Sequence, residues 1–355
     1  MEANLSVIDV IKSKIRRDIE QGVYTEGDKV PSELELAAEY RVGRAQSRQA
    51  LRDLESEGYI QRSRGRRSEV TPMSNWPGRV LHSTGAGIAA IAVPTCQSLY
   101  CRRLVEGFSA RVAESDFQTI SYNLSFDLAS EVQFLSHLRR LGVSMVALWL
   151  QHESEETLAL LRDLAQCRMP LVLVDHRARG LETDFVTTDN ETLGYGLTRR
   201  LLEKGHRRIG FLQDFYSLTS SEERHQGYLR ALCGAGLEAD PACSGMFDPG
   251  ARPDSARMLE GIMARKEKPT AFYCTHDSLA LAAAELFSSL GYDIPGDIEL
   301  ATSDDDEYSR ARGIPMVTAM QPGLEIGRAA AEILLARQAE PARPPDQRRI
   351  APVLS

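Results

Sequence analysis

The sequence lacks the features that mark membrane and secreted proteins. No uninterrupted apolar run approaches the ~18 residues that a bilayer-spanning helix needs. The start of the chain, MEANLSVIDVIKSKIRRDIE, has no continuous apolar core of the kind found in secretion signals, and its periodicity is that of an amphipathic helix. We therefore expect a cytoplasmic protein with no membrane partner.

Closely spaced cysteine pairs are also missing. No two of the six cysteines form a CxxC motif: Cys96, Cys101, Cys167, Cys233, Cys243 and Cys274. This spacing argues against a structural metal and against a disulfide framework, and it fits a reducing compartment. Cys96 and Cys101 are near enough along the chain to meet, but two free thiols are the simpler interpretation.

Catalytic signatures are absent as well. The chain has no P-loop, no GxSxG motif and no residues at metal-ligand spacing. We expect a protein that is not an enzyme, with no catalytic residues, no metal and no cofactor.

The chain also lacks an overall positive charge. It has 42 Lys+Arg against 50 Asp+Glu, a net charge of −8. Residues 1–78 hold 13 basic and 13 acidic residues, so the whole negative excess lies beyond them, and residues 41–67 hold eight arginines against three acids. A phosphate backbone responds to charge within about one Debye length, so this short segment can favour DNA in an acidic protein.

A stretch near the start, KVPSELELAAEYRVGRAQSRQALRDLESEGYI, has the pattern of two short helices joined by a tight turn. Ser32 and Glu35 have the S-x-x-E spacing of a capping box at the start of the first helix. We predict that Leu34, Ala37 and Ala38 form the buried stripe of that helix.

The second helix is expected at residues 44–57, after the turn Arg41-Val42-Gly43. Leu51 and Leu54 should face inward. The residues expected to project outward are Arg44, Gln46, Arg48 and Arg52. A short helix, a turn and a helix with a cationic outer face form the arrangement that enters the major groove in helix-turn-helix proteins.

Residues 59–70 predict a β-hairpin with an arginine-rich tip. Its turn contains Arg64, Gly65, Arg66 and Arg67. Alone, this cluster also fits a solvated loop. Directly after a helix pair it indicates a wing that contacts the DNA backbone or a neighbouring groove.

From Ile11 to Val70 the chain resembles the winged-helix domain of the GntR family of bacterial transcription regulators. The matching residues are IEQGVYTEGDKVPSELELAAEYRVGRAQSRQALRDLESEGYIQRSRGRRSEV. Gly43-Arg44-Ala45-Gln46-Ser47 replaces the family's usual Ser-Arg-x-Thr/Pro-Val, and Arg44 matches its DNA-contacting arginine. The DNA-binding residues that we predict are Ser32, Arg44, Gln46, Arg48, Arg52, Arg64, Gly65, Arg66 and Arg67.

Residues 72–87 are rich in Pro, Gly and Ser, and we interpret them as a linker. From residue 88, short apolar runs such as IAAIAV, MVALWL and LVLVD alternate with helical patterns. This alternation predicts an α/β fold with doubly wound parallel sheets, and its length indicates two lobes. Ligands bind such folds where the carboxyl ends of the strands face a cleft.

Polar residues follow several of these strands. Those singled out are Asp175, Asp189, His276, Asp277 and Asp304. An acid at a helix N-terminus is often only a cap, and the acidic triplet that starts at Asp304 also fits a solvated loop. Like charges directly after a buried strand repel, however, unless a ligand or cation engages them.

Residues 88–340 resemble the effector domain of LacI/GalR-type regulators, which shares its fold with periplasmic sugar-binding proteins. The landmarks are VDHR, TTDNETLGYGLTRRLLEKGHRRIGFL, RHQGYLRALCGAGL and PTAFYCTHDSLALAAAELFSSLGYDIPGDIEL. The resemblance implies that Arg224 grips the ligand and that His276, where asparagine is usual, and Asp304 contact it. The predicted effector-binding set is Tyr100, Asp175, Asp189, Arg224, Phe247, His276, Asp277, Asp304 and Gln321. Sugar hydroxyls favour such carboxylate and guanidinium partners.

These patterns divide the chain into a winged helix at 1–71, a linker at 72–87, an effector domain at 88–340 and a Pro-rich tail at 341–355 that we expect to pack loosely. Lobe one should take residues 88–190 and 320–336, and lobe two residues 191–319.

We expect a ligand-responsive transcription regulator, a repressor of a carbohydrate-utilisation operon. Its partners would be double-stranded operator DNA, a sugar-like small-molecule effector and a second copy of the chain, because a homodimer places two winged helices on a two-fold operator. Ligand would change lobe closure and thereby DNA binding. The alternatives are a solute-binding protein for transport and a sugar-processing enzyme.

Overall fold

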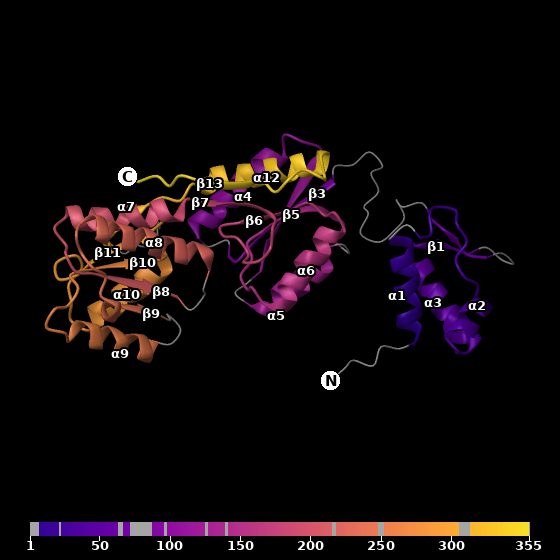
Figure 1. The fold of residues 1–355 in the computed structure, drawn as a ribbon, viewed down its shortest axis with the longest axis horizontal. Helices are drawn as coiled ribbons and strands as arrows, with labels where there is room; N and C mark the ends of the chain where they lie inside the picture. Colours follow the sequence, from indigo (N-terminus) through magenta and orange to yellow (C-terminus); the bar gives the residue numbers. More distant parts are fainter. Residues whose placement is uncertain are drawn as a thin grey trace. The chain divides into compact units, whose positions relative to one another are not determined.

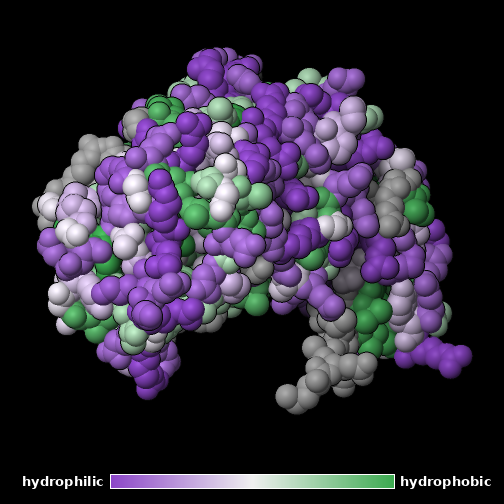
Figure 2. Space-filling model, turned by 60° about the vertical axis from the view of Figure 1, so that its left-hand side comes forward, coloured by the Kyte–Doolittle hydropathy of each residue, from purple (hydrophilic) through white to green (hydrophobic). Residues whose placement is uncertain are grey.

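The computed structural model describes residues 7–20, 23–62, 67–71, 87–95, 98–124, 127–138, 141–214, 218–247, 252–304 and 313–354, and Figure 1 shows their helices and strands. Within these ranges, no helix combines the length and apolarity needed to cross a membrane. Nor do their His, Cys, Asp and Glu side chains form a group that would hold a metal ion. Cys96 lies outside the described residues. The face in Figure 2 is mainly hydrophilic, with hydrophobic residues in small patches.

Residues 7–71 form three helices and a short hairpin. The helices are α1 (Val7–Glu20), α2 (Glu33–Glu39) and α3 (Arg44–Ser56), and β1 (Ile60–Gln61) pairs antiparallel with β2 (Glu69–Val70). The apolar faces of the three helices meet in one core that contains Ile11, Ile15, Ile19, Leu36, Leu51 and Leu54. The helix pair and the hairpin strands predicted from the sequence are therefore confirmed.

The predicted buried stripe of α2 was wrong. Leu34 is 59% exposed and Ala38 is also exposed, whereas Leu36 is buried and packs in the core. Residues two apart on a helix are separated by about 200° around its axis, so Leu34 and Leu36 cannot both face α3. The capping box fixes this rotation: Ser32 Oγ accepts from the Glu35 N–H at 3.3 Å, and Glu35 Oε2 accepts from the Ser32 N–H at 2.8 Å.

Lobe one is built on a six-stranded sheet with the order β13-β7-β6-β5-β3-β4. Its strands are β3 (Gly87–Val93), β4 (Phe117–Asn123), β5 (Val143–Leu148), β6 (Leu171–Val174), β7 (Asp184–Thr188) and β13 (Gln347–Ile350). Its helices are α4 (Leu99–Val112), α5 (Leu128–His137), α6 (Glu155–Gln166) and α12 (Gly323–Ala339). In Figure 1, α4 and α12 lie on one side of the sheet, and α5 and α6 lie on the other.

Lobe two is built on a five-stranded parallel sheet with the order β12-β11-β10-β8-β9. The strands are β8 (Ile209–Gln213), β9 (Ser244–Met246), β10 (Ala271–Cys274), β11 (Glu299–Ser303) and β12 (Val317–Ala319). The helices are α7 (Asn190–Glu203), α8 (Thr219–Gly234), α9 (Arg252–Met263) and α10 (Asp277–Ser289), with a 3₁₀ turn at Pro241–Cys243.

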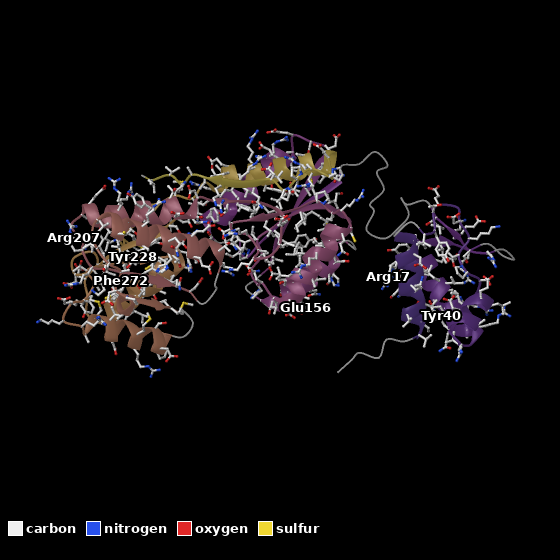
Figure 3. The ribbon with its side chains drawn as sticks, in the orientation of Figure 1. Arg17, Tyr40, Glu156, Arg207, Tyr228 and Phe272 are labelled. Carbon is white, nitrogen blue, oxygen red and sulfur yellow. The ribbon has the colours of Figure 1, made fainter. Side chains whose placement is uncertain are left out.

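Alternation along β10 explains the two layers of helices in lobe two. Phe272 and Cys274 pack in the cluster that contains α9 and α10 residues, whereas Ala271 and Tyr273 pack with residues of α7 and α8. A strand projects successive side chains to opposite faces, so an entirely apolar strand serves two cores. Figure 3 labels Tyr228 and Phe272, which fill these two cores.

Glycines let two helix pairs approach at backbone distance. A Cβ atom on Gly107 of α4 would lie 2.0 Å from the Leu324 carbonyl oxygen of α12, and one on Gly194 of α7 would lie 2.1 Å from the Arg224 carbonyl oxygen of α8. These positions exclude any side chain, so they fix how α8 is placed beside α7.

The C-terminal tail is an integral part of the fold, contrary to the expectation of loose packing. Strand β13 pairs in parallel with β7 at the edge of the lobe-one sheet, and Val353 then forms an antiparallel bridge with Met320. The Asp189 N–H donates to the Ile350 carbonyl at 2.8 Å, so the tail satisfies polar groups that β7 would leave unpaired. Its proline-rich composition concealed this strand. Five other elements were not predicted from the sequence: β7, β9, β12, α9 and α12.

Candidate functional site

A buried polar network surrounds Arg224, which α8 places against the crossings between the two lobes. Arg224 is only 5% exposed and donates four hydrogen bonds. Nε reaches Asn190 Oδ1 at 2.8 Å, Nη1 reaches Ser303 Oγ at 3.1 Å and the Thr275 carbonyl, and Nη2 reaches Gln321 Oε1 at 3.0 Å. A guanidinium that is removed from water needs such partners, and here they come from several strand ends.

Gln321 extends the network into both lobes. Its Oε1 also accepts from Thr188 Oγ1 at 2.8 Å, at the end of β7 in lobe one. Its Nε2 donates to Asp304 Oδ2 at 2.9 Å, directly after β11 in lobe two. A change in the angle between the lobes would therefore alter bonds within one connected set of side chains.

Asp304 is the most perturbed carboxyl of this network. The pKa of Asp304 is raised to about 7, chiefly by burial and then by the negative charge of Asp277, while Arg224 and the hydrogen bond from Gln321 oppose the shift. The backbone of Asp304 has φ = 75°, and that of Asp175 has φ = 73°. Aspartates whose backbone has a positive φ are uncommon, and such residues often occur at functional sites, where the side chain must point in a particular direction.

Several buried groups near these aspartates have no hydrogen-bond partner among the described residues. They include the hydroxyls of Tyr100, Tyr273 and Thr275. Burial raises the pKa of the Tyr100 hydroxyl well above its usual range, and the charges of Asp175 and Asp304 add to this shift. Buried polar groups are almost always satisfied, so these atoms point to a bound polar molecule that supplies their partners.

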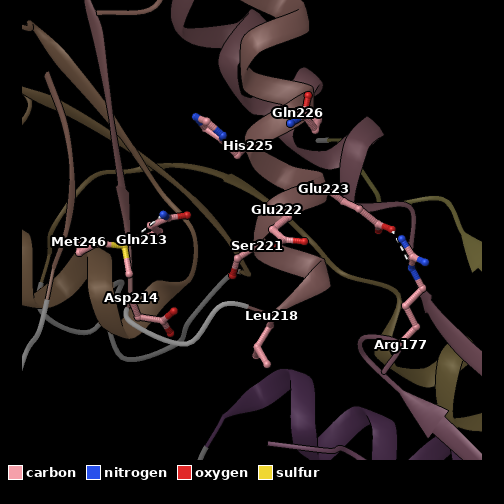
Figure 4. A pocket seen from close by; sticks show the side chains of 10 residues that line it. All are labelled: Arg177, Gln213, Asp214, Leu218, Ser221, Glu222, Glu223, His225, Gln226 and Met246. Carbon is pink, nitrogen blue, oxygen red and sulfur yellow. Dashed lines mark hydrogen bonds and ion pairs between the residues drawn. The ribbon is translucent and has the colours of Figure 1, made fainter. Parts of the chain in front are cut away.

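Figure 4 shows a cavity of about 500 Å³ beside α8, the helix that carries Arg224. It is bounded by Asp214, which follows β8, by Ser221 and His225 on α8, and by Arg177 from lobe one. Asp214 also contacts the residue that follows Thr275, because Asp214 Oδ2 and His276 Nε2 are 3.1 Å apart. Arg224 and Asp304 do not line this cavity, which shares the helix α8 with the network but none of the network's side chains. The volume suits a small organic molecule.

The structure brings five of the predicted effector residues together: Tyr100, Asp175, Arg224, Asp304 and Gln321. His276 lies at the rim, where Nδ1 accepts from the Leu279 N–H at 3.3 Å and caps α10. Asp277 lies in the first turn of α10, and its charge reaches Asp304.

Two predicted effector residues have other roles in the structure. Asp189 caps α7, because its carboxylate accepts from the Thr192 N–H at 3.0 Å and from Thr192 Oγ1 at 2.7 Å. Phe247 is fully buried in the lobe-two core, and its N–H donates to the Gln213 carbonyl at 2.7 Å. We therefore correct both expectations: the cap explains Asp189, and apolar packing explains Phe247.

The neutral members of the network were not predicted from the sequence: Thr188, Asn190, Tyr273, Thr275 and Ser303. Thr275 and Ser303 end or follow predicted buried strands, so a search of strand ends that included hydroxyls would have found them. Thr188 ends β7, a strand that was not predicted. At residues 189 and 190, the prediction singled out Asp189 and did not include Asn190.

In residues 7–71 the predicted DNA-binding surface is organised by one acid of α2. The Glu33 carboxylate lies 3.1 Å from Arg48 Nε, 2.6 Å from Arg62 Nη2 and 3.8 Å from Arg44 Nη2. Arg44 and Arg48 remain largely exposed at the N-terminal half of α3. Glu33 thus holds three guanidiniums together on one face, the arrangement that phosphate recognition uses.

Other predicted DNA-binding residues have structural partners. Ser32 caps α2, and Gln46 Oε1 accepts from the N–H of Gly43, the N-cap residue of α3, at 3.2 Å. Arg52 is exposed, and Arg67 forms an ion pair with Glu35. The wing residues Arg64, Gly65 and Arg66 lie outside the described residues.

Comparisons with family models match both parts of the chain. Residues 8–70 match the model of the bacterial regulatory proteins of the gntR family, and residues 198–355 match that of the periplasmic binding protein-like domain. Both predicted resemblances, and the α/β fold class with an N-terminal winged helix, are confirmed.

The similar proteins include transcriptional repressors. The HTH-type transcriptional repressor PurR of Aliivibrio salmonicida is 31% identical over 216 residues, which span 61% of this chain and 64% of that protein, less than two thirds of its length. The arabinose metabolism transcriptional repressor of Geobacillus stearothermophilus is 26% identical over 92% of this chain and 89% of its own. A solved structure described as a transcriptional regulator CelR-cellobiose complex has a TM-score of 0.67 at 22% identity, covers 92% of this chain and 98% of its own, and shows the shared fold.

Proposed function

We propose that this protein is a ligand-responsive transcription repressor. Residues 1–71 bind double-stranded operator DNA, residues 72–87 link them to the effector domain at 88–340, and a small molecule in the cleft between the lobes modulates DNA binding. The observation that carries the proposal is the polar network of Arg224, Gln321 and Asp304, which joins both lobes and adjoins buried groups that lack partners among the described residues.

Support for the DNA-binding role comes from the gntR-family domain and from the charge of its exposed face. Arg44 and Arg48 lie where a recognition helix meets base edges and phosphates, and Arg67 lies where a wing reaches the backbone. A protein that binds operator DNA must share a compartment with the chromosome, so we propose a cytoplasmic location. A homodimer, which would place two winged helices on a two-fold operator, is part of the same proposal.

Support for a sugar-like effector comes from the chemistry of the cleft. Two buried carboxylates, Asp175 and Asp304, with the hydroxyls of Tyr100 and Tyr273, match the alternating donors and acceptors of a polyol. The names of two similar proteins mention sugars: one is a repressor of arabinose metabolism, and the other was solved as a complex with cellobiose. We extend a carbohydrate effector to this chain on that basis.

The alternatives are less well supported. A solute-binding protein for transport would not need a gntR-family domain at residues 8–70. A sugar-processing enzyme would need an acid and a nucleophile at a solvent-accessible bond, whereas Asp304 is engaged with Gln321 and the similar proteins are repressors.

The test begins with selection of the DNA sites that the full-length protein binds from a random pool. Arg44→Ala should weaken binding to the selected site by about 1–3 kcal/mol at fixed salt. The control is Arg17→Ala, on α1 and outside the Glu33 group. A thermal-shift screen of pentoses, hexoses, their phosphates and their glycosides should then identify a ligand that stabilises the protein and releases or strengthens DNA binding. Unchanged DNA affinity in Arg44→Ala would contradict the assigned surface.

A further inference from the structure

A single stripe of α8 runs from the effector cleft toward a second cavity. Ser221, His225 and Leu229 are four residues apart, so they lie on one face of the helix. Ser221 lines the first cavity, His225 lines both cavities, and Leu229 lines a second cavity of about 470 Å³. The two cavities also share Gln213 and Met246, so they adjoin each other along the edge of the lobe-two sheet.

The second cavity is apolar and carries no formal charge. Its walls include Phe211, Leu229, Ala239, Pro241 and Met246, and no Asp, Glu, Lys or Arg side chain lines it. His225 packs against Phe211 with ring centroids 4.7 Å apart, and burial lowers the pKa of its imidazole, which keeps the ring neutral at pH 7. Such walls accommodate an uncharged alkyl or aryl group and stabilise it by removing apolar surface from water.

The first cavity and the network have the opposite character. Asp214, Glu222 and Glu223 line the first cavity beside one guanidinium, that of Arg177. Arg177 is already 3.8 Å from Glu223. In the network, the donors of Arg224 are directed at protein acceptors.

This balance favours a ligand that donates hydrogen bonds and opposes one that carries a phosphate or a carboxylate. An anionic ligand would lie close to several carboxylates. The two guanidiniums, Arg177 and Arg224, already have an acidic partner or protein acceptors, so they would not offset this repulsion.

We propose that the effector is an uncharged or cationic glycoside with two chemically distinct parts. Its hydroxyl-bearing ring lies in the first cavity, and its apolar alkyl or aryl substituent lies in the second cavity against Leu229 and Ala239. This inference rests on the proposed effector function, because it assigns the ligand class of the same cleft. Free sugars and sugar phosphates are then poor effectors.

The test is calorimetric titration of the full-length protein with matched probes. The probes are 4-nitrophenyl and methyl glycosides of glucose, galactose, xylose and arabinose, the free sugars, and the 6-phosphates of glucose and galactose. For the sugar that binds, the 4-nitrophenyl glycoside should bind roughly ten- to a hundredfold more tightly than the methyl glycoside, since burying a ring of this size contributes that much. The phosphates should bind more weakly than the free sugars.

Two variants test whether the tighter binding of the 4-nitrophenyl glycoside comes from the second cavity. Ala239→Glu places a carboxylate on its wall and should remove the advantage of the nitrophenyl group without changing binding of the methyl glycoside. The matched control is Ala242→Glu, which adds the same group at an exposed position that lines neither cavity. Leu229→Gln, which keeps the size of the side chain and loses its apolar surface, gives a second reading if Ala239→Glu unfolds.

The outcomes separate this inference from the proposed function. Equal binding of methyl and nitrophenyl glycosides, tighter binding of a phosphate, or equal losses for both glycosides in Ala239→Glu would overturn the two-part ligand and leave a sugar effector intact. If no sugar or glycoside of the panel binds, the carbohydrate effector function fails together with the inference, while the DNA-binding test stands apart from both.

Discussion

Replacing Asp304 with asparagine tests the electrostatics of the network directly. The folded protein holds the proton of Asp304 up to about pH 7, whereas an unfolded aspartate releases it near its ordinary value of 3.8. Because the folded state binds this proton more tightly, protonated Asp304 stabilises the fold at low pH. That contribution is complete below pH 3.8 and is lost as the pH rises toward 7.

The pKa difference fixes the size of the effect. Each pKa unit corresponds to 1.36 kcal/mol, so full ionisation of Asp304 costs about 4 kcal/mol, of which about 3 kcal/mol falls between pH 5 and pH 8. Asp304→Asn keeps an oxygen acceptor for the Gln321 amide and cannot ionise. From pH 5 to pH 8 the unfolding free energy of the original protein should therefore fall by about 3 kcal/mol more than that of the variant.

Urea unfolding at pH 5 and pH 8 measures this difference. Tryptophan fluorescence reports on lobe one through Trp149, whose ring centroid lies 5.6 Å from that of Tyr100, and the second tryptophan, Trp76, is common to both proteins. His225 has a lowered pKa and contributes a pH dependence of opposite sign, but it is present in both proteins and cancels in the comparison. Parallel pH profiles for the two proteins would refute a protonated Asp304 and place an ionised carboxylate in the network.

Two further predictions concern packing around the site. Gly194→Ala directs a Cβ at the Arg224 carbonyl and should destabilise the effector domain by more than about 2 kcal/mol and abolish ligand response; Gly261→Ala in α9, where nothing lies within 4 Å, is the control in thermal melts. Arg337→Ala leaves the buried Asp184 carboxylate, now 2.7 Å from Arg337 Nη2, without its cation and should cost roughly 3–5 kcal/mol in urea unfolding. A loss below 1 kcal/mol would show that other groups compensate Asp184.

Periodicity and turn chemistry were enough to predict most of the fold. The isoleucines of α1 recur every three or four residues, and runs such as LVLV are apolar throughout, so their structures follow from local sequence. Short strands such as β9, with the sequence SGM, and β13, with QRRI, have no such signal. They are strands because a sheet edge supplies hydrogen bonds, which is a property of the assembled domain and not of the segment.

The site was predictable where charge marked it. Asp304 stood out because a charge directly after a buried strand requires a partner, whereas Arg224 was assigned to the site by the resemblance alone. Asp189 was misleading, since an acid before a helix serves as a cap in many proteins, and only the distances to Thr192 decide its role. Phe247 depended on the resemblance alone, and its core position is a three-dimensional fact that no spacing reveals.

Glu33 gives the DNA-binding surface an internal counterion. Much of the free energy of protein–DNA association comes from small cations released from the duplex, and each phosphate that a protein neutralises contributes to the slope of log affinity against log salt. The Glu33 carboxylate lies 3.1 Å from Arg48 Nε and 2.6 Å from Arg62 Nη2, so its negative charge offsets part of the positive charge that these arginines present to phosphates. The net positive charge of this surface is therefore smaller than the number of its arginines. We expect operator affinity to decline less steeply with salt concentration than it would if every arginine neutralised one phosphate.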